Sequence, residues 1–186
     1  MKKLIVFMFM LISSTLFASD SGFHVYGAFD LTDKAAVSIS GVAVKCNSTT
    51  GPGVGVGYSF LPHELGFSVD STYFFDRTID FGTIFGVTPF SSKYSQVVTQ
   101  FNVLLKVNEN STVFGGVNYP YMTFSDTSAK VDGEMGYQGG LIIGSGNLTY
   151  KVSYQFIKGV PKGSLMNTSD KYTSEGFVGS VSMTLL

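Results

Sequence analysis

Apolar and polar residues alternate along most of this chain with the period of a β-strand. The clearest run starts at Leu65, and a second run covers Leu148 to Phe156. Because successive side chains of a strand point to opposite sides of the sheet, each run predicts one apolar face and one mostly polar face. In the first run the apolar side carries Leu65, Phe67, Val69, Tyr73 and Phe75, with Ser71 among them, and the other side carries Gly66, Ser68, Asp70, Thr72 and Phe74.

The polar faces of these two runs include full charges, Asp70 in the first and Lys151 in the second. A water-soluble barrel needs an apolar interior, so charges on the enclosed side indicate an inverted pattern. Such a pattern is typical of a barrel whose apolar face contacts lipid.

About eight strands of this kind follow one another, and most approach the roughly 9–11 residues that a tilted strand needs to cross a bilayer. The predicted fold is all-β: a single antiparallel up-and-down transmembrane β-barrel. The expected strands are Phe23–Leu31, Gly53–Phe60, Leu65–Phe75, Gln96–Val107, Thr112–Tyr119, Gly133–Ile143, Leu148–Ile157 and Gly176–Leu186.

Tight turns and long connections alternate between the expected strands. The tight ones, rich in turn-forming residues, lie at residues 61–64, 108–111 and 144–147, and the long ones at 32–52, 76–95, 120–132 and 158–175. Outer-membrane barrels have this asymmetry, with short periplasmic turns and longer extracellular loops.

The first 18 residues have the order of a secretory leader. Lys2 and Lys3 precede the apolar run Leu4–Ile12, which is too short to span a bilayer, and small and polar residues follow up to Ala18. We therefore expect a signal peptide over residues 1–18 and a single β-barrel domain over residues 19–186.

The composition agrees with a membrane barrel and argues against an ordinary soluble domain, a nucleic-acid-binding protein and a disulfide-stabilised fold. Charged residues make up only 13% of the chain, whereas soluble domains carry about 25%. The net charge of −1 gives no reason to expect nucleic acid as a partner. Cys46 is the only cysteine, so no intramolecular disulfide can form.

At the level of pattern, the chain from Gly22 to Leu186 resembles the small OmpA-type outer-membrane β-barrels of Gram-negative bacteria. The resemblance rests on the alternating strands Gly53–Tyr58 and Tyr150–Phe156 and on the alternating final strand. It implies location in the outer membrane after secretion, with outer-membrane lipids, lipopolysaccharide and the barrel-assembly machinery as partners. Members usually end in an aromatic residue, whereas this chain ends in Leu185 and Leu186.

Five charged residues are expected to face the lumen. Asp70, Lys106 and Lys151 fall in the half nearer the tight turns, and Asp30 and Glu134 fall nearer the outer rim. An eight-stranded barrel is just wide enough for side chains to fill, and opposite buried charges should pair. Pairing of Asp70 with Lys106 or Lys151 would make a polar plug that keeps the barrel round; the alternative is a narrow ion path.

The sequence offers no catalytic, cofactor or metal site. A serine nucleophile at the outer rim would need a histidine near it, but His24 and His63 both fall at the periplasmic end, where His24 is expected to pack in the lumen or at the interface. One cysteine and two separated histidines give no metal-ligand spacing. The run Gly51–Gly57 lacks the Lys-Ser/Thr of a phosphate loop, and alternating glycines facing a narrow lumen explain it.

The connection Asp76–Ser95 is unusually apolar for an exposed segment. It extends its flanking strands, folds into the rim of the barrel, or forms a contact surface for an extracellular partner. We thus expect a non-enzymatic outer-membrane barrel with a structural or surface-interaction role. The alternatives are a narrow pore and a soluble periplasmic, lipocalin-like binder with its apolar face turned inward.

Overall fold

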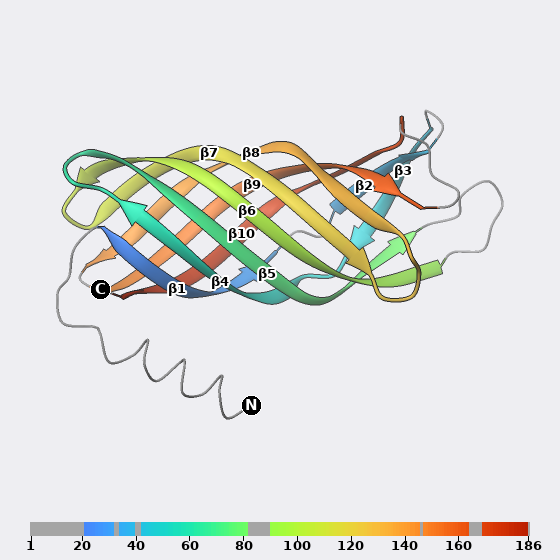
Figure 1. Cartoon of the computed structure of the whole chain (residues 1–186), viewed down its shortest axis with the longest axis horizontal. Helices are drawn as coiled ribbons and strands as arrows, with labels where there is room; N and C mark the ends of the chain where they lie inside the picture. The colour runs from blue at the N-terminus through green and yellow to red at the C-terminus, as the bar shows by residue number, and fades with distance from the viewer. Residues whose placement is uncertain are drawn as a thin grey trace, which may run out of the picture.

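In the computed structural model the chain forms an antiparallel sheet that closes on itself (Figure 1). The structure describes residues 21–31, 34–39, 42–81, 90–145, 147–163 and 169–185, so the expected leader lies outside the described residues. No helix in those ranges is long and apolar enough to span a membrane. The sheet has ten strands over these residues: β1 (Gly22–Asp30), β2 (Lys34–Ile39), β3 (Val42–Ser48), β4 (Gly51–Phe60), β5 (Leu65–Phe81), β6 (Phe90–Asn108), β7 (Ser111–Phe124), β8 (Lys130–Ser145), β9 (Leu148–Lys162) and β10 (Lys171–Leu185).

The ten described strands form two stacked rings. In the lower tier β1 and β4 lie between β10 and β5, whereas in the upper tier β2 and β3 take those places. Strands β5 to β10 run through both tiers, so each tier has eight strands among the described residues. The predicted barrel of about eight strands is confirmed. The hairpin β2–β3 was not predicted; it occupies most of the expected connection 32–52.

The chain stays hydrogen-bonded where β1 gives way to β2 and β3 gives way to β4. The Leu31 N–H donates to the Phe177 carbonyl oxygen, and the Thr49 N–H donates to the Thr78 carbonyl oxygen, each over 2.8 Å. Strand β5 carries a bulge at the same level, between Phe74 and Arg77. The two breaks, here named the kinks, therefore keep hydrogen bonds to the neighbouring strands through the described residues Leu31 and Thr49.

The strands are longer than the alternation predicted, chiefly at the end away from the tight turns. Strand β5 continues to Phe81 and β6 begins at Phe90, so most of the apolar connection 76–95 is strand, and its residues 82–89 lie outside the described residues. Of the interpretations of this segment, extension of the flanking strands is the correct one for its described parts.

The tight turns, the start of β1 and the end of β10 lie together at the end of the barrel drawn on the left in Figure 1. The hairpin β2–β3 and the connection 125–129 between β7 and β8 lie at the opposite end. For the described residues, the expected separation of short turns from longer loops is confirmed.

The outer face of the lower tier is apolar and its inner face is polar. Phe67, Tyr150 and Val152 are each about half exposed, whereas Asp70 is 3% exposed. The apolar face of the expected strands therefore points outward, as predicted. Other large outward apolar residues are Phe23, Val54, Val56, Leu65, Phe101, Val103, Leu105, Val113, Leu141, Ile143, Val181 and Met183.

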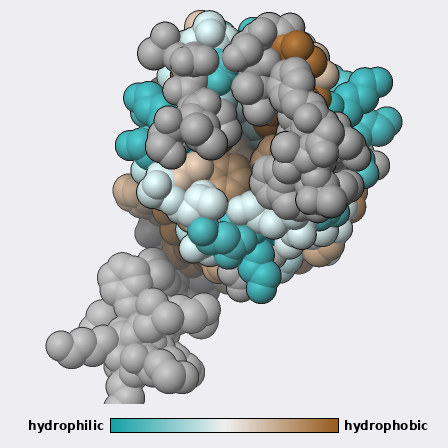
Figure 2. Space-filling view, turned by 90° about the vertical axis from the view of Figure 1, so that its right-hand side faces the viewer, coloured by the Kyte–Doolittle hydropathy of each residue, from teal (hydrophilic) through white to brown (hydrophobic). Residues whose placement is uncertain are grey.

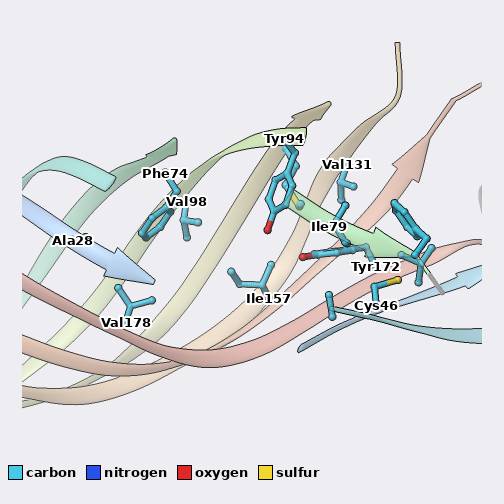
Figure 3. Close-up of a cluster of buried hydrophobic side chains, with 14 residues drawn as sticks. Ala28, Cys46, Phe74, Ile79, Tyr94, Val98, Val131, Ile157, Tyr172 and Val178 are labelled. Carbon is cyan, nitrogen blue, oxygen red and sulfur yellow. The ribbon is translucent and has the colours of Figure 1, made fainter. Parts of the chain in front are cut away.

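The upper tier has the opposite polarity. Its interior holds an apolar cluster in which Tyr94, Ile79, Met122 and Tyr172 are almost completely buried (Figure 3). Viewed from the upper end, hydrophilic residues gather on the outer rim around a hollow with hydrophobic residues on its floor (Figure 2). The barrel is thus inverted in the lower tier and built like a soluble barrel in the upper tier.

Candidate functional site

Asp70 is the centre of a polar network inside the lower tier. Its carboxylate accepts hydrogen bonds from His24 Nε2 over 2.6 Å, from Ser68 Oγ over 3.0 Å and from Asn102 Nδ2 over 3.1 Å. These donors come from β1, β5 and β6, so the network joins three strands. A buried carboxylate is costly unless its oxygens are bonded, and here both are.

Lys151 reaches the same carboxylate from β9. Its Nζ lies 3.3 Å from Asp70 Oδ2 and 3.2 Å from Gln100 Oε1. The ammonium group also lies 4.6 Å from the centre of the Phe114 ring, a favourable position for a cation. Asp70 and Lys151 therefore form an ion pair across the lumen, one of the two pairings expected for Asp70.

Glycines on β4 make room for this network. A Cβ at Gly55 would collide with the Tyr26 ring, and a Cβ at Gly57 would collide with Asp70 and His24. The alternating glycines therefore face a lumen too narrow for larger side chains, as the sequence indicated.

A cavity lies between the Asp70 network and the tight-turn end. Its volume is about 110 Å³, and Ser59, Thr112, Thr149 and Ser182 are among the residues that line it. Hydroxyl groups and a few apolar side chains make up most of this lining, so the cavity is suited to water. It ends at the layer that holds Asp70 and Lys151.

A second polar cluster closes the lumen at the level of the kinks. Arg77 Nη1 donates to Asp30 Oδ2 over 2.6 Å and to Gln96 Oε1 over 2.9 Å. Arg77 Nη2 donates to Ser48 Oγ over 3.2 Å, and Nε donates to the Thr49 carbonyl oxygen over 3.2 Å. One guanidinium group thus binds β1, the end of β3 and β6 together.

The Arg77 cluster and the apolar cluster above it fill the lumen. Arg77, Asp30, Phe74 and Val98 are each at most 2% exposed. The described residues therefore close the barrel between the lower cavity and the upper rim.

The five sequence-predicted lumen residues lie in three different environments. Asp30, Asp70 and Lys151 lie in the lumen. Lys106 is half-buried near the tight-turn end, where its backbone N–H donates to the Glu64 carbonyl oxygen over 2.7 Å.

Glu134 lies on the outer face, and its expected lumen position is wrong. Its carboxylate is paired with Lys171 over 2.5 Å, and both side chains are partly exposed to solvent. The cause is a bulge in β8 between Glu134 and Tyr137. One extra residue reverses the alternation, so Glu134 no longer shares a face with Gln138.

The sequence did not predict that Arg77 lies in the lumen. This residue was assigned to the connection 76–95, where no lumen position was expected. The alternation of Arg77, Ile79 and Phe81 with Thr78 and Asp80 is the signal that could have placed it in a strand. His24 was expected to pack in the lumen or at the interface, and it lies against Asp70.

The comparisons with known proteins find relatives by structure alone. No family model and no curated protein matches the chain. Solved structures match most of it. The outer membrane protein OprG of Pseudomonas aeruginosa is 13% identical with a TM-score of 0.53, covering 88% of this chain and 96% of that chain. Neisserial surface protein A is 14% identical with a TM-score of 0.51, covering 91% and 100%.

The attachment invasion locus protein Ail of Yersinia pestis, solved in complex with the heparin analogue sucrose octasulfate, is a further match. It is 13% identical with a TM-score of 0.50, and the match covers 88% of this chain and 99% of Ail. At such low identity the likeness shows the fold alone. The chain has the fold of the small outer-membrane β-barrels, which confirms the resemblance at that level.

Proposed function

We propose that this chain is an integral β-barrel of the bacterial outer membrane with a structural or surface-interaction role and no catalytic activity. The observation that supports the proposal best is the outward apolar belt of the lower tier around a charged lumen. In water this belt would be an apolar surface far larger than soluble monomers expose.

The height of the belt approaches the roughly 25 Å of the apolar band on outer-membrane barrels. On β9 it runs from Leu148 to Phe156, which is about 26 Å along the strand and about 20 Å along the axis of a barrel whose strands tilt by 40°. Aromatic side chains gather at its upper edge, among them Tyr137, Tyr154 and Phe177, as in the girdle of such barrels. Outer-membrane lipids and lipopolysaccharide are the partners we propose for the belt, and the barrel-assembly machinery would insert it.

Surface interaction would use the outer face of the upper tier. Ile79 and Phe81 were candidates for an exposed contact surface in the segment 76–95, but both are buried inside the barrel. An extracellular partner would therefore meet the polar outer face of the upper strands.

The pore and the soluble binder are weaker alternatives. A pore would need a continuous water path, and the buried Arg77 layer fills the described lumen. A soluble binder would need Phe67 and Val152 inside and Asp70 outside, which is the reverse of their positions.

Membrane fractionation of cells that express a tagged chain, followed by electrophoresis with and without heating, tests the proposal. We expect the protein in the outer-membrane fraction, with faster migration before boiling, because a closed barrel stays folded in cold detergent. Recovery in the soluble periplasmic fraction would contradict the proposal, and discrete single-channel conductance after reconstitution would favour the pore.

A further inference from the structure

A groove of about 490 Å³ crosses the outer face of the upper tier. It spans β3, β2, β10 and β9, whose registers align their outward residues in two rows. In the upper row, the small side chains of Ala36 and Thr173 lie between two lysines and leave a depression. The upper row reads Lys45, Ala36, Thr173 and Lys158, and the lower row reads Asn47, Lys34, Glu175 and Phe156.

Lys34 and Lys45 line the groove, and Lys158 lies at the β9 end of its upper row. Lys34 and Lys45 are exposed, and within the described residues neither ammonium group is paired with a carboxylate. Lys158 lies with its Nζ 5.3 Å from the centre of the Phe156 ring. Lys45 and Lys158 are three strands apart, or about 14 Å between backbones, so their long side chains can converge on one anion.

The two carboxylates near the groove are already bound by other side chains. Glu175 accepts a hydrogen bond from the Tyr154 hydroxyl over 2.7 Å. Glu134 is paired with Lys171. Glu175 lines the groove and keeps its negative charge, so three lysines face one unneutralised carboxylate, and this excess of positive charge complements an anion.

The groove lies directly above the aromatic edge of the belt. Phe156 belongs to its lining and stacks on Tyr137 with ring centroids 4.9 Å apart. Aromatic rings of this kind mark the level of lipid headgroups. An anion in the groove would thus be at headgroup height, while acyl chains attached to it could lie along the apolar belt below.

We propose that this groove binds the phosphate of a lipid headgroup in the outer leaflet, with Lys34, Lys45 and Lys158 as its ligands. The inference rests on the proposed membrane location and goes beyond it by naming the site and the chemistry that it recognises. The lipid is held by charge at the lysines and by apolar contact at the belt. A free phosphate would have only the first of these interactions.

Native mass spectrometry of the purified chain in non-ionic detergent, with added bis-phosphorylated lipid A, tests this proposal. The variant Lys34→Gln/Lys45→Gln/Lys158→Gln should bind the lipid about thirtyfold more weakly than the unchanged chain, because each lysine near an anionic surface contributes about threefold to affinity. The matched control Lys93→Gln/Lys130→Gln/Lys162→Gln removes three lysines elsewhere on the upper tier and should change binding less than about twofold.

Further arms separate the lipid from other anions. Dephosphorylated lipid should bind weakly to every variant. Neither inorganic phosphate nor a sulfated oligosaccharide, each at about 100 times the lipid concentration, should displace lipid A. Equal binding by both triple variants would overturn the proposal, and so would displacement by either soluble anion.

Heat-modifiable migration of each variant separates this inference from the proposed function. If the triple variant is a folded barrel and binds lipid A as tightly as the unchanged chain, the groove is not the binding site. That result would contradict this inference but not the proposed membrane location. If the triple variant does not fold, the exposed single substitution Lys45→Gln takes its place, with an expected loss of about threefold; no loss there would also overturn the site.

Discussion

At the scale of single residues, the Asp70 carboxylate joins four strands of the lower tier. It binds His24 on β1, Ser68 on β5, Asn102 on β6 and Lys151 on β9. Side chains that bind across a narrow lumen hold opposite walls together, and a buried charge is stable only with such partners. We therefore expect the closed barrel to depend strongly on this one residue.

Asp70→Asn should lower the free energy of unfolding by about 3 kcal/mol, because it leaves the buried Lys151 ammonium group without its counter-charge. Urea unfolding in detergent micelles measures the change. The double variant Asp70→Asn/Lys151→Met should recover part of the loss. An Asp70→Asn barrel as stable as the original would show that the network contributes nothing.

The glycines of the barrel separate into crowded and open positions. Gly55→Ala places a methyl group against the Tyr26 ring and should cost about 2 kcal/mol, the range for an overpacked interior. Gly27→Ala is the control, since no atom lies within 4 Å of its added Cβ. Its effect should stay within about 0.5 kcal/mol. Equal losses at both positions, measured by the same unfolding experiment, would contradict the account of a crowded lumen.

The Cys46 thiol should be unreactive in the folded chain. It is 3% exposed, and burial raises its pKa to about 11. Because only the thiolate reacts, iodoacetamide should label folded protein very slowly at pH 8 and unfolded protein readily. The labelling rate, followed by intact-mass spectrometry, should rise only as the pH approaches 11. Rapid labelling of the folded chain at pH 8 would mean that the thiol is accessible.

At the scale of elements, uninterrupted alternation was enough to predict most of the barrel wall. Asp70 and Lys151 lie on strand segments without irregularities, so their lumen positions followed from the period of two. Glu134 and Arg77 lie beside bulges in β8 and β5. A bulge shifts the period by one residue, and nothing in a single sequence marked where these bulges fall.

The sequence also does not show which side chains the predicted lumen charges contact. His24 and Asp70 are 46 residues apart, and Asp30 and Arg77 are 47 apart. Which strands meet across the lumen depends on the shear of the closed barrel, which alternation does not fix. The hairpin β2–β3 was not predicted because the alternation breaks near Leu31 and Thr49, so the sequence between these residues looks like a connection between two strands.

Arg77 joins the hairpin β2–β3 to the rest of the barrel. Arg77→Lys keeps the charge but loses the fork that reaches Asp30, Ser48 and Thr49 together, and should lower the free energy of unfolding by about 2 kcal/mol. The loss should be local. Hydrogen exchange of amides in β2 and β3 should accelerate, while amides of β7 and β8 keep their protection. Uniform acceleration in all strands, or none in β2 and β3, would contradict this role.

At the scale of the whole molecule, the polarity of the wall reverses between the tiers. Below the kinks, apolar side chains point outward and charges point inward. Above them, Ile79, Tyr94 and Tyr172 fill the interior, and lysines lie on the outer rim. The level of reversal coincides with the aromatic residues Tyr137 and Tyr154. Under the proposed membrane location, hydrocarbon surrounds the lower tier and water surrounds the upper tier.

Neighbouring positions on β9 give the most direct test of that arrangement. The chain contains no tryptophan, so Tyr150→Trp, which faces outward, and Thr149→Trp, which lines the lower cavity, each provide a single fluorophore of side-chain size. Both are reconstituted in bilayers whose lipids carry bromine on their acyl chains. The account predicts strong quenching at position 150 and little at position 149. Quenching at 149 with none at 150 would contradict it.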